Sequence, residues 1–188
     1  MTTMNKAILA IVLIAAVAAG CKQQQQQTQW GSGQAGQQQP VVMPPAMVKG
    51  AEEIKQLESI ARSNPKNANA WTQLGNALMD AQRYAEAVIA YQRSLDLDPK
   101  NADVRVDMGT CYRGVGQPEK AIEEYQKALK YNPRHPNAYL NTGVVYAYDL
   151  NRPKEALKAF EKYLEVFPQA PNAAQVREEI AKAKAVAK

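Results

Sequence analysis

Three patterns of hydrophobic and polar residues follow one another along the 188-residue chain. Residues 7–19, AILAIVLIAAVAA, form an uncharged apolar run. Residues 22–50 are rich in glutamine, glycine and proline and show no hydrophobic period. From Ala51 onward, long segments have few breaks and favour helix, which predicts an all-α fold for this part of the chain.

The breaks between the predicted helices recur at an almost constant distance. Pro65, Pro99, Pro133 and Pro168 are spaced by 34, 34 and 35 residues. The same period relates a set of glycines, a set of alanines and a set of aromatic residues: Gly75, Gly109 and Gly143; Ala87, Ala121 and Ala156; Tyr91, Tyr125 and Phe160. Self-similarity at this period indicates an array of helical repeats, each with two helices of about 14 residues.

The prolines fit this reading. Pro118 and Pro153 lie where the second helix of a repeat begins, in the first turn that tolerates proline. The recurring prolines at the end of each unit stop the second helix before the next repeat. Because one helix pair cannot cover its own apolar face, neighbouring pairs are expected to stack.

The pattern Trp71-x-x-Leu74-Gly75-x-x-Leu78, followed by Ala87-x-x-x-Tyr91 and Pro99, resembles the tetratricopeptide repeat (TPR). The resemblance covers Ala51 to the C-terminus and implies a right-handed α-α superhelix. Its three full repeats are 68–101, 102–135 and 136–170. Repeat two has Arg105 where the tryptophan would be, and repeat three has one extra residue, expected in the turn near 149–152. The recurring glycine is expected to face the paired helix near Ala87.

The two ends are predicted to be caps. Residues 51–67 align with 85–101 and form a half repeat, a second helix without its first. Residues 171–188 form a capping helix, with an apolar stripe of Ala173, Val176, Ile180 and Ala183. Arg177 and Glu178 replace the leucine–glycine pair of a full repeat, so the last stacking surface is charged.

The N-terminal segment resembles a bacterial lipoprotein signal peptide over residues 1–20, with Met4 as a second possible start. Its apolar run is shorter than the 20 or so residues that span a bilayer. The sequence AAGC resembles a lipobox, which implies that Cys21 carries lipid. The alternatives are an ordinary signal peptide, or a short uncleaved anchor with Cys21 incidental. Lys22 after the cysteine favours the outer membrane, facing the periplasm, by resemblance to Gram-negative lipoproteins.

Residues 21–50 are interpreted as a disordered tether that carries the lipidated cysteine. Such a chain has a root-mean-square length of about 30 Å and reaches about 95 Å when extended. Trp30 and residues 41–48, VVMPPAMV, are apolar islands in it. They are read as loosely ordered or, for 41–48, as the lead into the first helix; a docking peptide is the alternative.

No catalytic chemistry is expected. The net charge is +5, but Ala51 onward holds 20 basic and 18 acidic residues, which is no nucleic-acid footprint. His135 is expected to be solvated in a turn, and Cys111 to be a small core residue. The acid pairs 52–53, 123–124 and 178–179 are read as solvated helix faces. No residue pattern predicts a metal or cofactor site.

Binding remains as the function. By resemblance, the first helices of TPR pairs line a groove that receives a protein segment. The corresponding positions of the three repeats are Asn69, Thr72, Asn76, Met79 and Asp80; Asp103, Val106, Thr110, Arg113 and Gly114; and Asn137, Leu140, Val144, Ala147 and Tyr148. The groove is predicted to be mixed in repeats one and two, and apolar with an aromatic residue in repeat three.

One TPR subtype grips C-terminal carboxylates of chaperones with lysine, asparagine and arginine. The equivalent positions here are Thr72, Asn76, Asp107, Asn137 and Asn141, of which only Asn76 matches. That function is therefore rejected. The expected function is a membrane-anchored adaptor or scaffold in a bacterial envelope assembly. The alternatives are a pilotin-like assembly factor for pili or secretion channels, and a self-associating scaffold.

Overall fold

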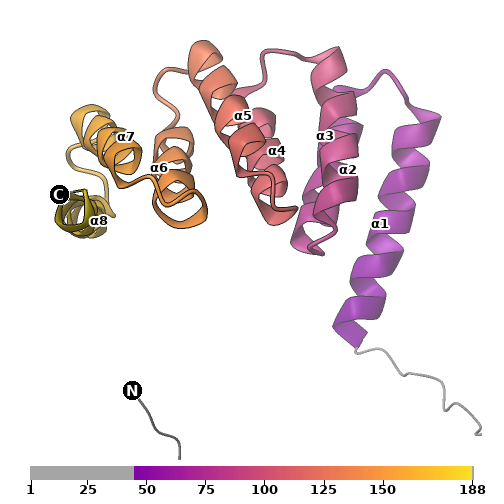
Figure 1. The fold of residues 1–188 in the computed structure, drawn as a ribbon. Coiled ribbons are helices and arrows are strands. Elements are labelled where there is room, and N and C mark those ends of the chain that lie inside the picture. Colours follow the sequence, from indigo (N-terminus) through magenta and orange to yellow (C-terminus); the bar gives the residue numbers. More distant parts are fainter. Residues whose placement is uncertain (1–44, 188) are drawn as a thin grey trace, which may run out of the picture. The chain divides into compact units, whose positions relative to one another are not determined.

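A computed structural model describes the backbone of residues 45–187 and the side chains of residues 50–187 (Figure 1). This part of the chain contains helices and no strand, as predicted. The helices are α1 (Pro45–Ser63), α2 (Ala68–Asp80), α3 (Tyr84–Leu97), α4 (Ala102–Gly114), α5 (Pro118–Tyr131), α6 (Pro136–Val144), η1 (Val145–Asp149), α7 (Pro153–Val166) and α8 (Ala173–Val186). Cys21, Trp30 and the predicted signal peptide lie outside the described residues.

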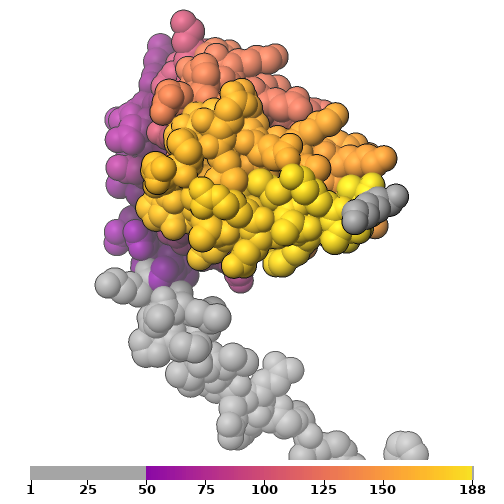
Figure 2. All heavy atoms as spheres, turned by 90° about the vertical axis from the view of Figure 1, so that its left-hand side faces the viewer, coloured from indigo at the N-terminus to yellow at the C-terminus, as the bar shows by residue number. Residues whose placement is uncertain are grey.

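Consecutive helices pack against each other in sequence order. α2 with α3, α4 with α5, and α6 and η1 with α7 form the three repeats, while α1 covers α2 and α8 covers α7. Figure 2 shows the yellow atoms of α8 on the outside, beside the orange atoms of the third repeat. The helix α1 begins at Pro45, six residues before the predicted boundary, so residues 45–50 extend the half repeat.

A glycine and an aromatic ring pair in every repeat. The rings of Tyr91, Tyr125 and Phe160 are fully buried, and each lies against the glycine of its own first helix. A Cβ added to Gly75 would lie 2.5 Å from Tyr91 Cε1. The expectation that this glycine faces the helix near Ala87 was imprecise, because its nearest neighbours are ring atoms one turn further on.

A second contact repeats at the tryptophan position. Trp71 Nε1 donates to the carbonyl oxygen of Pro65 at 3.1 Å, and Tyr139 Oη donates to that of Pro133 at 3.0 Å. Arg105 makes the equivalent bonds to the Pro99 carbonyl from Nε and Nη2, at 3.2 and 2.7 Å. In each repeat, therefore, a different type of side chain ties the first helix to the preceding turn, and the acceptor is always the carbonyl oxygen of the recurring proline.

The first helices also share an N-terminal cap. The side chains of Asn67, Asn101 and His135, 34 residues apart, accept hydrogen bonds from the backbone N–H groups of Ala70, Val104 and Ala138. His135 is only 6% exposed, and its Nε2 lies 2.9 Å from Asp103 Oδ1. The prediction of a solvated turn histidine was wrong, because the ring replaces asparagine as a cap.

The extra residue of repeat three lies in a helix and not in a turn. The turns between first and second helices are three residues long in all three repeats. The insertion is instead absorbed by η1, a π-helical turn in which Leu150 N donates to Val145 O at 3.0 Å. A single inserted residue widens one turn in this way, which leaves the flanking turns in register.

Each of the three turns contains one left-handed residue: Gln82 with φ 58°, Gly116 with φ 73° and Asn151 with φ 51°. Glycine and asparagine adopt this conformation readily, whereas glutamine does so at a cost.

Most core residues are apolar, and Cys111 is buried among them as predicted. Burial raises the pKa of its thiol to about 12, so the group stays protonated. Glu124 is an exception to the predicted solvated face, because its side chain is buried. It accepts from Arg105 at 2.9 Å and from Lys127 at 2.5 Å, which compensates the buried charge.

Candidate partner-binding face

The predicted groove positions lie on α2, α4, α6 and η1; we call the accessible surface of these helices the first-helix face. Three contacts join neighbouring first helices directly. They are His135 with Asp103, Asn141 Nδ2 with Thr110 Oγ1 at 3.5 Å, and Arg113 with Asp149. These bonds bring the predicted positions of repeats two and three together, while α2 of repeat one lies beside α4 without such a bond among the described residues.

Most predicted positions reach solvent. The exposed ones are Asn69, Asn76, Asp80, Asp103, Arg113, Asn137 and Tyr148, and the half-buried ones are Thr72, Met79, Thr110, Leu140, Val144 and Ala147. Val106 is a correction, because it is 3% exposed and packs in the core with Ala121 and Tyr125. Gly114 is exposed, but a Cβ there would lie 2.5 Å from the ring of Tyr84.

The hydroxyl groups of Thr72 and Thr110 and the amide of Asn76 are held by internal bonds. Thr72 Oγ1 contacts Ser94 Oγ at 2.7 Å, and Thr110 Oγ1 contacts Tyr125 Oη at 3.3 Å. Tyr91 Oη donates to Asn76 Oδ1 at 2.8 Å, which leaves the Asn76 amide N–H groups directed away from this bond. These contacts fix the orientation of side chains that a partner would meet.

The charge of the face is net negative. In the described structure α2, α4, α6 and η1 contain neither lysine nor glutamate, and their anions are Asp80, Asp103, Asp107 and Asp149. Asp107 is half-buried, and the structure shows no hydrogen bond or ion pair from its carboxylate to any described residue. Burial first, and then the nearby Asp103 and Asp80, raise the pKa of Asp107, with His135 opposing them.

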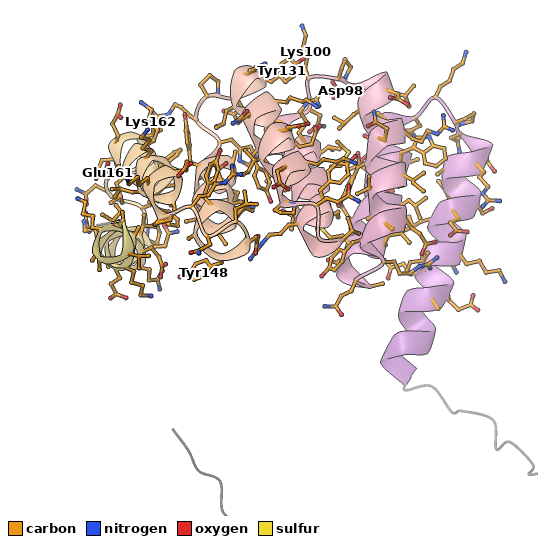
Figure 3. The ribbon with its side chains drawn as sticks, viewed as in Figure 1. Asp98, Lys100, Tyr131, Tyr148, Glu161 and Lys162 are labelled. Carbon is orange, nitrogen blue, oxygen red and sulfur yellow. The ribbon has the colours of Figure 1, made fainter. Side chains whose placement is uncertain are left out.

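The third repeat presents a different surface. Arg113 forms two bonds to Asp149, from Nε at 2.5 Å and from Nη2 at 3.1 Å, so its charge is neutralised within the domain. Tyr148 is 60% exposed and donates to Glu179 of α8. Figure 3 shows Tyr148 pointing outward, on the edge opposite the loop that carries Asp98 and Lys100.

Hollows lie at both ends of this face, and one of about 610 Å³ beside the α1–α2 loop includes Asn69. A small cavity of about 140 Å³ lies between η1 and α8, beside Tyr148 and Val186. A cleft of about 650 Å³ beside the α7–α8 loop includes Asn137 at its edge. The described residues contain no cluster of histidine, cysteine and carboxylate groups suited to a metal ion. Within residues 45–187, no helix has the length and apolarity needed to cross a bilayer.

Some residues of the face could not be found from groove positions alone. Asp149 was missed because the extra residue shifts its register, and Asp107 and Asn141 were considered only as positions of the carboxylate-binding subtype. A related signal is visible in the sequence: the segments that form α2, α4, α6 and η1 carry aspartates and no lysine.

Comparison with known proteins identifies the same fold. The family model of the cytochrome c-type biogenesis protein H TPR domain matches residues 51–174. A comparison with curated protein sequences gives no match.

Solved structures with the same fold include the MamA protein, with a TM-score of 0.65 and 21% identity over 75% of this chain and 76% of that one. The first TPR of Spaghetti (RPAP3), bound to the HSP90 peptide SRMEEVD, has a TM-score of 0.57 and 25% identity over 63% and 93% of the two chains. The Sgt2 TPR domain from Aspergillus fumigatus has a TM-score of 0.56 and 26% identity over 62% and 76%.

Proposed function

Because this chain belongs to the family of the cytochrome c-type biogenesis protein H TPR domain, we propose that it is an adaptor that holds a segment of a partner protein on its first-helix face. The TPR fold supports a role in protein–protein interaction. The observation that carries the assignment to this face is the set of exposed side chains on the first helices, which direct bonds join between repeats two and three.

The similar RPAP3 domain was solved with a peptide bound, which supports a short segment as the kind of partner. That peptide is acidic, whereas the first helices here carry four aspartates. Of the five carboxylate-binding positions only Asn76 fits, and Asp107 would repel a bound carboxylate. The adaptor is therefore expected to bind a segment other than an acidic C-terminal peptide.

The adaptor is proposed to be anchored to a membrane through lipid on Cys21, with residues 22–44 as a tether that sets its reach. The support is the AAGC sequence after an apolar run, and the low-complexity composition that follows it. Lys22 favours the outer membrane of a bacterial envelope, with the domain in the periplasm. Incorporation of labelled palmitate should be lost in Cys21→Ser, and labelling of that variant would overturn the anchor.

The self-associating scaffold is disfavoured as an alternative by the charges at both ends. Glu53 of α1 is exposed, whereas Ala87, the equivalent residue of repeat one, is buried. Arg177 and Glu178 of α8 are both exposed. Joining the ends of two copies would bury these charges without partners. Sedimentation at increasing concentration should show a constant mass; a rising mass would favour the scaffold. A pilotin-like role remains a special case of the adaptor.

Site-specific cross-linking tests the face. A photoreactive phenylalanine analogue is placed at Asn69, Asn137 or Tyr148 on the first-helix face, or at the matched exposed positions Glu123 and Lys158 on second helices. We expect cross-links to a partner protein in cell envelopes from the first set only. Equal yields from the second set would show that another surface binds the partner.

A further inference from the structure

The first-helix face has an electrostatic character opposite to that of the chain, whose net charge is +5. Its four helical segments contain two cationic side chains, Arg105 and Arg113, against four aspartates. Lysines of the described residues 50–187 lie on α1, on second helices, on α8 or in loops. The net-negative face is therefore a local property, which the balance of the domain does not explain.

Both cations are already committed inside the domain. Arg105 points to the turn before α4, where it binds the Pro99 carbonyl and the buried Glu124. Arg113 is held by Asp149 through two bonds. Neither guanidinium is free to neutralise Asp80 or Asp107.

Asp107 is the most informative of these groups. Its carboxylate is half-buried, with Asp80 of α2, Asp103 and His135 as the titratable groups that act on it, and no described residue donates a hydrogen bond to it. A half-buried anion without a partner is unfavourable in the free domain. A cationic group from outside would remove this cost, because it would supply both the missing donor and the missing charge.

Resting on the proposed function, we propose that the segment held on the first-helix face carries lysine or arginine, with one cationic side chain seated against Asp107 and Asp80. The amide N–H groups of Asn76 stand beside this point and can donate to a backbone carbonyl of the same segment, because Tyr91 fixes the amide through its oxygen. A segment rich in carboxylates is excluded by repulsion from the same aspartates.

The test uses an immobilised library of random heptapeptides, probed with the full-length chain and three variants. Asp80→Asn and Asp107→Asn remove one charge each from the face, and Glu123→Gln removes one from an exposed second-helix position that makes no ion pair among the described residues. Folding of each variant is checked by circular dichroism. Binding to the selected peptides is then measured at low and high salt, with amide chemical shifts mapping the contact.

We expect selected peptides enriched in lysine or arginine, with shifts at Asn76 and Asp107 on binding. The affinity for the selected peptides should fall about tenfold in Asp107→Asn, while Glu123→Gln leaves it unchanged. Added salt should also lower the affinity. Neutral or acidic peptides that shift the same residues would overturn the charge preference and leave the adaptor function intact. Peptides that shift only second-helix residues, or an absence of any bound peptide, would overturn both.

Discussion

The ring of Tyr91 occupies the space into which a side chain at position 75 would project. The contact sets the distance between α2 and α3, because the ring is fully buried and cannot move into solvent. It occurs again between Gly109 and Tyr125 and between Gly143 and Phe160.

Gly75→Leu should therefore destabilise the domain by about 1–3 kcal/mol and lower its melting temperature, because the ring must shift in a packed core. The control is Gly50→Ala in α1, where an added Cβ meets nothing within 4 Å. That variant should gain about 0.5–1 kcal/mol from helix propensity. Thermal unfolding checks both, and an unchanged or higher melting temperature for Gly75→Leu would refute the contact.

The left-handed residue of each turn gives a reciprocal pair of variants. Gln82→Gly should stabilise the domain by about 0.5–1 kcal/mol, because it relieves a left-handed side chain but enlarges the entropy of the unfolded state. Gly116→Gln should cost about 1–2 kcal/mol at the equivalent position. Urea unfolding measures both, and effects of the same sign in the two variants would contradict the turn geometry.

Arg105 and Glu124 should behave as a unit. Arg105→Ala leaves the Glu124 carboxylate buried with only Lys127, and should cost about 3 kcal/mol. Repeat one has Trp71 and Ala90 at the two equivalent positions. The double variant Arg105→Trp with Glu124→Ala should recover most of the loss, and a double variant as unstable as the single one would show that the positions are independent.

The cap of α6 can be tested with the residue that the other repeats use. His135→Asn should keep the bond to Ala138 N–H and change the free energy of unfolding by less than about 0.5 kcal/mol. His135→Ala removes the cap and should cost about 1 kcal/mol. Equal stability of the alanine and asparagine variants would show that the cap contributes nothing.

Asp107→Asn should raise the melting temperature by a few degrees at neutral pH. The raised pKa of Asp107 means that the folded state binds the proton more tightly than the unfolded state. Its unfavourable contribution is therefore present above the folded pKa and disappears as the pH falls through it to about 3.9, the ordinary aspartate value. Unfolding curves from pH 7 to pH 3 should show the variant's advantage shrinking, and an advantage that grows toward low pH would refute the assignment.

The architecture could be predicted because its determinants recur at a fixed period. Gly75, Tyr91 and Pro99 each perform a packing or chain-breaking role that only a few residue types can fill, so their spacing reveals the repeat. The half repeat and the charged cap followed from the same alignment, and the capping helix predicted at 171–188 contains α8.

Individual side chains were harder to predict because repeat positions are filled by different chemistry. Arg105 and Trp71 donate to the same kind of carbonyl acceptor, and His135 and Asn67 accept from the same kind of N–H group, although their side chains are dissimilar. Burial of Glu124 depended on Arg105, 19 residues away. Val106 was wrongly predicted to face the groove, because its position number within the repeat does not fix the rotation of α4 about its axis.

The π-helical turn of η1 has a consequence for how such chains change length. An insertion in a loop would lengthen the connection, whereas this one is stored inside a helix and leaves Pro153 at the start of α7 and Phe160 against Gly143. Chain length and repeat spacing are thereby uncoupled. The added residue instead alters the local surface at Tyr148 and Asp149, so that a change too small to disturb the scaffold can give one repeat a specificity of its own.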